Sequence, residues 1–290
     1  MSDYDHGKGE NTINTVKIPR ALTLAGSDAS GGAGLEADLK TFQEFCVYGM
    51  TAVTVIVAQT PGEWAHEVFP VELSVIAKQL DTILAGIGVD AMKTGMLGTN
   101  EIIEVGAHYV KKYAVKNLVV DPVMVCKGAD DVMNPDTVRY LSKTLLPLAK
   151  VATPNLYETG FLSGLGAITT LEQLKEAAKR VHALGPEVVV AKGGAKLEHP
   201  LAVDVFYDGK EVIVLEGERI DTSWTHGAGC SYSAAIAAGI AVGESIRDAV
   251  FNAKEFIAGA IKASFPLNKF AGPLDHAARR RAPTAGGSGK

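Results

Sequence analysis

The sequence predicts a three-layer α/β domain in which a central, mostly parallel β-sheet is flanked by helices. Short β-like runs alternate with helix-like segments along most of the chain, which is typical of parallel sheets with helical crossovers. The run at 51–58 is β-branched and apolar throughout, as expected of a strand buried on both faces. Glycine and polar residues follow most of the expected strands, at the sheet edge where such folds bind ligands.

The expected elements follow one another in a regular order. We expect strands at 21–25, 51–58, 91–92, 118–120, 151–152, 188–191, 202–207 and 211–215. We expect helices at about 35–45, 73–87, 171–184 and 232–243, with one that starts near residue 100 and another that closes the chain. Asp208 and Gly209 separate the last two strands and predict a tight hairpin turn.

Composition predicts one domain at 20–276, with a flexible arm at 1–19 and a flexible tail at 277–290. A chain of 290 residues that is 47% hydrophobic has ample material for a core. The net charge of −5 gives no reason to expect nucleic acid as a partner, and no apolar run is long enough to span a membrane. The three cysteines are too few and too scattered for a disulfide framework or a zinc site, so we expect a cytoplasmic protein.

The most informative stretch is the glycine-rich run at 225–231, THGAGCS, which precedes a helix of small residues. Backbone N–H groups at a helix start point at one spot, and the helix dipole adds positive charge there. We therefore expect an anion site at Gly227, Ala228 and Gly229. The same environment would lower the pKa of Cys230 and favour its thiolate.

Two further loops fit a nucleotide. Lys192 ends a strand and precedes Gly193 and Gly194. The lysine would supply a point charge for a phosphate chain, and the glycines would let the backbone approach it closely. Asn155 and Glu158 flank a helix start. One interpretation is a simple capping box. In the other, Asn155 faces nucleotide phosphates and Glu158 orders magnesium and its waters. The two roles can coexist in part.

The first loop, at 26–34, contains the dinucleotide pattern G-x-G-x-x-A, but the glycines come late and the strand at 51–58 ends at Gln59 with no acidic residue. A floor for a small substrate, with Asp28 as a polar contact, is the better interpretation. Residues 121–134 leave a buried strand and enter a polar stretch, which predicts a flap that excludes water from the site. The chain has no G-x-x-x-x-G-K-[ST] loop.

Together these motifs resemble the ribokinase-like superfamily, in its vitamin-kinase branch. The resemblance spans about 21–276 and rests on LAGSDASGGAG at 24–34, ADLKTF at 37–42, MKTGML at 92–97, DPVM at 121–124, TPN at 153–155, KGG at 192–194 and HGAGC at 226–230. Within the branch the chain is similar to bacterial pyridoxine/pyridoxal/pyridoxamine kinases related to hydroxymethylpyrimidine kinases. The cysteine in MVCKG at 124–128 favours the pyridoxal side.

The resemblance implies a ribokinase-like fold with a flap, a homodimer, and phosphorylation of a vitamin B6 hydroxymethyl group by ATP with Mg²⁺. It assigns the anion hole to Gly227, Ala228 and Gly229, with Cys230 in the position of the base. It assigns nucleotide contacts to Asn155, Lys192, Gly193, Gly194 and Gly229. It assigns metal-linked acids, acting through water, to Asp121 and Glu158. It assigns the substrate pocket to Gly26, Asp28, Gln59, Met96 and Cys126, and the Cys126 thiol could also add reversibly to the pyridoxal aldehyde.

Other functions stay open at this point. Gln59 matches the position where pyrimidine kinases of thiamin synthesis bind their ring, so that activity is the runner-up. A sugar kinase, a nicotinamide-dependent oxidoreductase and a ligand-binding regulator without activity fit fewer of the motifs. Base catalysis contributes at most about 10²- to 10⁴-fold. Because positioning and charge stabilisation dominate phosphoryl transfer, replacing a carboxylate by Cys230 need not abolish catalysis.

Overall fold

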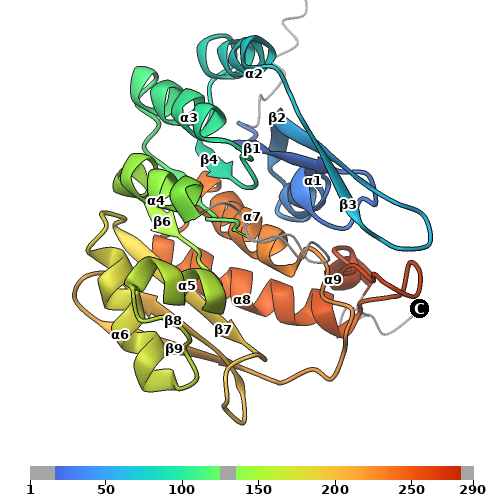
Figure 1. Ribbon diagram of the computed structural model, residues 1–290, viewed down its shortest axis with the longest axis vertical. Coiled ribbons are helices and arrows are strands. Elements are labelled where there is room, and N and C mark those ends of the chain that lie inside the picture. Colours follow the sequence, from blue (N-terminus) through green and yellow to red (C-terminus); the bar gives the residue numbers. More distant parts are fainter. Residues whose placement is uncertain (1–16, 125–134, 282–290) are drawn as a thin grey trace, which may run out of the picture.

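A nine-stranded sheet forms the centre of the computed structural model, which describes residues 17–124 and 135–281 (Figure 1). The strands are β1 Arg20–Asp28, β2 Tyr48–Gln59, β3 His66–Pro70, β4 Ala91–Thr94, β5 Leu118–Val120, β6 Val151–Ala152, β7 Val188–Gly194, β8 Ala202–Tyr207 and β9 Val212–Gly217. The helices are α1 Gly34–Glu44, α2 Leu73–Leu80, α3 Asn100–Lys112, α4 Pro135–Thr144, α5 Leu156–Ser163, α6 Leu171–His182, α7 Ala228–Ala241, α8 Ile246–Lys262 and α9 Ala278–Arg281. A π-helical turn, Asp81–Ala85, extends α2, and a 3-10 turn, Leu146–Leu148, follows α4.

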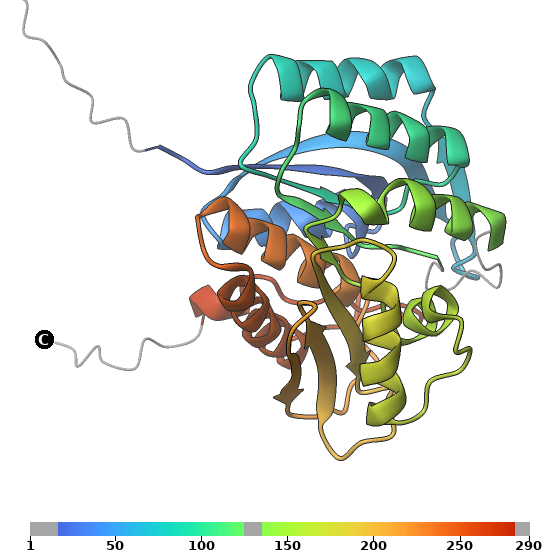
Figure 2. The ribbon, with the colours of Figure 1, turned by 90° about the vertical axis from the view of Figure 1, so that its left-hand side faces the viewer.

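The sheet order is β3-β2-β1-β4-β5-β6-β7-β8-β9. The six strands β2, β1, β4, β5, β6 and β7 run parallel, whereas β3, β8 and β9 pair antiparallel at the two sides. Helices cover both faces (Figure 2). This arrangement confirms the predicted three-layer α/β fold with a mostly parallel sheet.

Successive side chains of a strand pack alternately against the two helix layers. Ala21 of β1 packs in the core formed with α1, α7 and α8, whereas Leu22 packs in the core formed with α2, α3 and α4. A third cluster lies where α5 and α6 cover β7 and β8. This alternation follows from the period of two in a strand, which turns consecutive side chains to opposite faces. The predicted hairpin between β8 and β9 is also confirmed, with Gly209 at φ 84°.

Several boundaries differ from the prediction. β2 is longer than 51–58, and the expectation that it is buried on both faces is wrong, because Ile56 is 48% exposed. β3 was not predicted, since the five residues HEVFP show no clear alternation. α4 was also not predicted. α7 begins at Ala228 rather than at residue 232, so Cys230 lies inside its first turn. Helix α9 continues regular structure past the predicted domain end at residue 276.

The chain leaves β1 in one direction to reach β2 and later returns to the other side of β1 through β4. Such a reversal opens a crevice at the carboxyl ends of the two central strands. The loop after β1, the loop after β4 and the start of α7 come close to one another at this edge of the sheet.

A fully buried ion pair lies beneath this crevice. Lys93 Nζ of β4 contacts Asp38 Oδ1 of α1 at 2.6 Å, and both side chains have no exposed surface. Thr23 of β1 donates to the second carboxylate oxygen of Asp38 at 2.6 Å. Burial lowers the pKa of Lys93, but Asp38 together with Cys230 and Asp121 raises it by more, so the net pKa is above its ordinary value. The pair therefore ties β1, β4 and α1 together.

Replacing Lys93 by methionine leaves the Asp38 carboxylate buried without a counter-charge. We expect Lys93→Met to lower the free energy of unfolding by about 3–5 kcal/mol, because a broken buried pair exposes one charge to the apolar interior. Urea denaturation followed by circular dichroism measures this change.

The double variant Lys93→Met/Asp38→Leu removes both charges and should recover most of the loss. The exposed pair Glu176–Arg180, joined at 3.0 Å, provides the control, since Arg180→Met should cost less than about 1 kcal/mol. A Lys93→Met variant as stable as Arg180→Met would show that the buried pair contributes nothing.

Candidate active site

The predicted site residues that the structure describes gather at the carboxyl edge of the sheet. They come from the ends of β1, β2, β5 and β7, from the loops after β4 and β6, and from the first turns of α5 and α7. Cys126 and the rest of the segment 125–134 lie outside the described residues. The flap that the sequence predicts falls largely on that segment.

Asp28 is the centre of a hydrogen-bonded cluster at the end of β1. Gln59 Nε2 donates to Asp28 Oδ1 at 2.8 Å, and His226 Nε2 lies 2.8 Å from Oδ2. The backbone N–H groups of Ser30 and Ala33 donate to the same carboxylate, each at 2.9 Å. Although burial raises the pKa of Asp28, these hydrogen bonds lower it well below its ordinary value. Asp28 is therefore ionised, and its carboxylate holds Gln59, His226 and the loop after β1 in place.

Gly26 and Met96 lie side by side on the floor of the crevice. A Cβ added to Gly26 would stand 2.6 Å from Val55 Cγ2 and 3.8 Å from Met96 Cβ. Thr54 Oγ1 donates to the Met96 carbonyl at 2.6 Å and so holds the loop after β4 against β2. Glycine is thus required at position 26, because Val55 already occupies the space that a side chain would need.

Gly227 is the turn that starts α7. Its φ is +82°, and an added Cβ would stand 1.9 Å from the Gly32 carbonyl oxygen, so only glycine fits. Within the described part of the chain, the N–H of Ala228 donates to Thr225 O and that of Ser231 to Gly227 O. The first turn of a helix otherwise leaves its N–H groups without a partner. The N–H groups of Gly229 and Cys230 have no recorded acceptor within the described residues.

Lys192 brings a positive charge to the same turn. A Cβ at Gly229 would stand 3.4 Å from Lys192 Nζ. Lys192 Nζ also lies 3.0 Å from Asp121 Oδ1, and its side chain is 12% exposed. Burial lowers the pKa of Lys192, but Asp121 and Glu158 raise it by more, so the net pKa lies above its ordinary value. The start of α7 therefore combines N–H donors with a protonated lysine.

Gly193 and Gly194 follow Lys192 in a bulge where the pairing of β7 with β8 shifts register. Gly194 has a φ of +55°, and its N–H donates to Asp204 Oδ1 at 3.1 Å. An added Cβ at Gly193 would stand 2.6 Å from the Val203 carbonyl oxygen. Both glycines are thus required by the backbone itself, whatever they bind.

Asn155 and Glu158 form the capping box that the sequence allows. Glu158 N donates to Asn155 Oδ1 at 3.0 Å, and Asn155 N donates to Glu158 Oε2 at 2.7 Å. The other carboxylate oxygen of Glu158 accepts from Met124 N at 3.3 Å. Burial raises the pKa of Glu158 to about 7, although Lys192 lowers it. The amide oxygen of Asn155 is committed to the cap, and its amide nitrogen has no recorded partner within the described residues.

The carboxylates of Asp121 and Glu158 are both held by hydrogen bonds from the protein. Asp121 accepts hydrogen bonds from Lys192, Thr153 and Ser233, at 3.0, 3.1 and 3.2 Å. Among the residues that the structure describes, no group of three His, Cys, Asp or Glu side chains is placed to hold a metal ion.

The expectation that the α7 start produces a thiolate at Cys230 is wrong. Burial raises the pKa of the half-buried Cys230 thiol to about 11; Lys93 lowers it, but Asp38 and Asp121 raise it further. The helix dipole acts only over the first turn, and here the loss of hydration outweighs it. Cys230 is accordingly a protonated thiol at neutral pH.

Several residues of this region have no role in the sequence-based prediction. Lys93 was noted only as a polar residue that follows a strand, His226 only as part of the motif HGAGC, and Glu36 was not singled out. Glu36 accepts from Ser27 Oγ at 2.6 Å and from Asp28 N at 2.8 Å, which holds the end of β1 against α1. Their glycine-rich neighbourhood was the available signal, but it did not reveal their partners.

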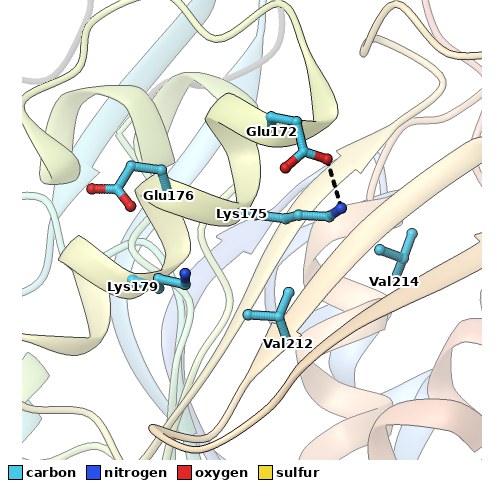
Figure 3. Close-up of a pocket in the computed structure, with 6 residues that line it drawn as sticks. All are labelled: Glu172, Lys175, Glu176, Lys179, Val212 and Val214. Carbon is cyan, nitrogen blue, oxygen red and sulfur yellow. Dashed lines mark hydrogen bonds and ion pairs between the residues drawn. The ribbon is translucent and has the colours of Figure 1, made fainter.

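A separate pocket of about 420 Å³ lies between α6 and β9 (Figure 3). It is lined by Glu172, Lys175, Glu176, Lys179, Val212 and Val214. Lys175 pairs with Glu172 at 2.7 Å, so part of its charge is already neutralised. None of the predicted site residues lines this pocket. In the two described stretches, 17–124 and 135–281, no helix is both long enough and apolar enough to cross a membrane.

Comparison with known proteins agrees with this geometry. The family model described as phosphomethylpyrimidine kinase matches residues 28–275. The chain belongs to this family. The pyridoxine kinase of Bacillus subtilis is 57% identical over 266 residues, which cover 91% of this chain and 98% of the relative. The hydroxymethylpyrimidine/phosphomethylpyrimidine kinase of the same bacterium is 37% identical over 267 residues, which cover 92% and 97%.

Solved structures of this family are also similar. The ADP complex of Bacillus subtilis pyridoxal kinase has a TM-score of 0.89 and 56% identity, and the match covers 91% of this chain and 100% of that one. The Staphylococcus aureus pyridoxal kinase in complex with AMP-PCP and pyridoxal has a TM-score of 0.87 and 44% identity, with coverage of 92% and 96%. The family members that act on vitamin B6 are thus more similar to this chain than the pyrimidine kinase is.

The raised pKa of Cys230 predicts slow alkylation. Between pH 7 and 9 we expect the rate with iodoacetamide to rise about tenfold per pH unit without a plateau, because only the thiolate reacts. Peptide mass spectrometry after timed quenching measures the rate at each cysteine separately.

The exposed Cys46 is the internal reference and should react faster at every pH. In urea, where burial is lost, the two cysteines should react alike. A plateau for Cys230 below pH 8 would mean that the thiol has the lowered pKa after all.

Proposed function

We propose that this chain phosphorylates the 5-hydroxymethyl group of pyridoxal, pyridoxine and pyridoxamine with MgATP as the donor. The observation that carries the proposal is the start of α7, where the N–H groups of Gly229 and Cys230 lie beside the protonated Lys192. The identity of the acceptor is supported by the 57% identity with a pyridoxine kinase and by the pyridoxal in the similar Staphylococcus aureus structure.

In this proposal the nucleotide approaches from the β7 side. Lys192 meets the phosphate chain as a point charge, and Gly193, Gly194 and Asn155 lie next to it. The transferring phosphoryl group rests on the N–H groups of Gly229 and Cys230, which stabilise charge on its oxygens. Magnesium neutralises the phosphate charge when it is bound with ATP. Asp121 and Glu158 would order its waters, since hydrogen bonds from the protein hold both carboxylates in fixed positions.

The vitamin approaches from the β1 side, over Gly26 and Met96. Gln59 donates to Asp28 through its amide nitrogen, which leaves its amide oxygen for a ring substituent. The hydroxymethyl oxygen attacks the γ-phosphorus as the bond to the β–γ bridging oxygen breaks, and ADP leaves. The attacking oxygen becomes acidic as its new bond forms, so its proton can pass to the Cys230 sulfur late in the reaction, while the S–H hydrogen of Cys230 passes to an oxygen of the transferred phosphoryl group. A thiolate before the reaction is therefore not required.

A second candidate is the hydroxymethylpyrimidine/phosphomethylpyrimidine kinase of thiamin synthesis. Gln59 favours it, because the resemblance places a pyrimidine ring against this position. The 37% identity with the Bacillus subtilis enzyme of that name is lower than the identity with the pyridoxine kinase. Phosphorylation of pyrimidine is therefore proposed as a side activity.

ADP release in the presence of MgATP tests both candidates. We expect turnover with pyridoxal, pyridoxine and pyridoxamine, weaker turnover with hydroxymethylpyrimidine, and none with ribose. Omission of Mg²⁺ should abolish turnover because the phosphate charge is then not neutralised. Turnover that does not depend on any acceptor would contradict a small-molecule kinase.

Cys230→Ala in the same assay examines the proton acceptor. We expect kcat with pyridoxine to fall about 10- to 100-fold, at or below the lower end of the range of about 10²- to 10⁴-fold for general base catalysis. Cys46→Ala, at an exposed site, is the matched control and should leave kcat unchanged. A Cys230→Ala variant with wild-type kcat would remove Cys230 from the mechanism. Cys126 lies outside the described residues, and its addition to the aldehyde stays a sequence-based prediction, as does a cytoplasmic location.

We also propose that two copies associate through β2 and β3, in the homodimer that the resemblance implies. Ile56 and Phe69 are directly paired across these strands and are 48% and 52% exposed. Val68, on the same edge strand, is 40% exposed. Exposed apolar side chains next to an edge strand are typical of an interaction surface.

Light scattering should give twice the chain mass of 30.4 kDa. Phe69→Lys places a charge in the proposed contact and should give the single-chain mass. Phe251→Lys, at an exposed apolar residue of α8, is the control and should leave the mass unchanged. A wild-type chain that remains at 30.4 kDa would contradict the dimer.

A further inference from the structure

A buried serine and a buried histidine meet behind the start of α7. Ser231 Oγ lies 2.8 Å from His276 Nε2, and the two residues are 0% and 6% exposed. Ser231 belongs to the first turn of α7, whereas His276 comes from the segment before α9. Neither residue has a role in the site described above.

Ser231 acts directly on the turn that precedes the anion hole. Its hydroxyl donates to the Gly227 carbonyl at 2.9 Å, and its backbone N–H donates to the same oxygen at 2.9 Å. The carbonyl of Gly227 is part of the peptide plane that leads into Ala228. Holding this oxygen therefore fixes the direction of the following N–H groups.

The hydrogen bonds determine the role of the histidine. A hydroxyl has one proton to donate. Since Ser231 gives it to Gly227, the serine oxygen accepts from His276, and the Nε2 atom carries hydrogen. We assign this tautomer from the bonding pattern. Burial and Lys40 lower the pKa of His276 to about 4, although Asp275 raises it, so the ring is neutral at pH 7.

The surroundings of the ring are charged but balanced. His276 lines a cavity of about 540 Å³ together with Asp275, with Glu255 and Lys262 of α8, with Glu218, and with Arg279 of α9. Lys40 of α1 faces it from the other side. The turn itself is pressed against Gly32, which a Cβ at Gly227 would meet at 1.9 Å. The start of α7 is thus held between Gly32 and the Ser231–His276 pair.

We infer that His276 is a positioning residue for phosphoryl transfer, acting through Ser231 and the Gly227 carbonyl on the N–H groups of Gly229 and Cys230. This inference rests on the proposed kinase function. It differs from a purely structural role, because a structural role would affect stability alone. A positioning role requires that loss of the hydrogen bond lower kcat while the affinity for both substrates stays the same.

Three variants separate these roles. His276→Phe fills the space without a donor, His276→Gln keeps a donor near the position of Nε2, and Ser231→Ala removes the acceptor. We expect kcat of folded enzyme at 25 °C to fall about 10- to 100-fold for His276→Phe and Ser231→Ala, since small displacements of catalytic groups have effects of this size. We expect KM for pyridoxal and for MgATP to change less than twofold, and His276→Gln to recover kcat to within about threefold of the parent.

The double variant Ser231→Ala/His276→Phe should be no slower than the slower single variant, because both changes break one chain of contacts. Ser163→Ala is the matched control. Its hydroxyl donates to Gly160 O at 3.2 Å in the last turn of α5, at the end of the helix remote from Asn155, and its loss should leave kcat unchanged.

Hydrogen–deuterium exchange of the peptide that contains 227–232 provides a readout that does not depend on turnover. Exchange should rise at least threefold in His276→Phe and stay at the parent rate in His276→Gln. Equal kcat and equal exchange in the parent and in His276→Phe would overturn the inference, even where the melting temperature falls. A parent without kinase activity would instead refute the proposed function, and an unchanged exchange rate in His276→Phe would refute the claim that His276 holds the start of α7.

Discussion

The buried carboxylate of Asp121 is the constraint on which the site depends. It accepts hydrogen bonds from Lys192 at the end of β7, Thr153 after β6 and Ser233 in α7, while its own N–H donates to Thr94 O in β4. An unpaired charge in the interior costs several kcal/mol, so these partners must all be present together. Three segments that are distant in sequence are thereby fixed around the carboxylate of Asp121, and its backbone N–H adds β4 as a fourth.

This constraint joins two halves of the site. On one side Lys192 stands next to Gly229, and on the other His226 reaches Asp28 at the end of β1. The turn at Gly227 lies between them and touches Gly32 so closely that no side chain fits. A phosphate donor and a hydroxymethyl acceptor would therefore meet at the first turn of α7, with little freedom in their relative position. Such preorganisation is the main source of rate enhancement in phosphoryl transfer.

Burial also raises the pKa of the Cys230 thiol. A helix start favours a thiolate, whereas removal from water favours the thiol, and the second effect is larger here because the pKa rises to about 11. The positive charges of Lys93 and Lys192 are largely matched by Asp38 and Asp121. In the proposed mechanism the site therefore works by alignment and by N–H donors, with proton transfer as a late step.

Contacts within a few residues were determined by the sequence. The alternation of strands and helices, the hairpin at Asp208 and Gly209, and the capping box of Asn155 and Glu158 depend on local spacing, and all three are present in the structure. Only the tertiary structure decided which distant residues meet: Lys93 with Asp38 across 55 positions, Ser231 with His276 across 45, and Asp28 with His226 across 198. It also decided the protonation of Cys230. Hydration is lost only when remote segments close over a group, and the amino acids beside Cys230 in the chain do not say which segments those are.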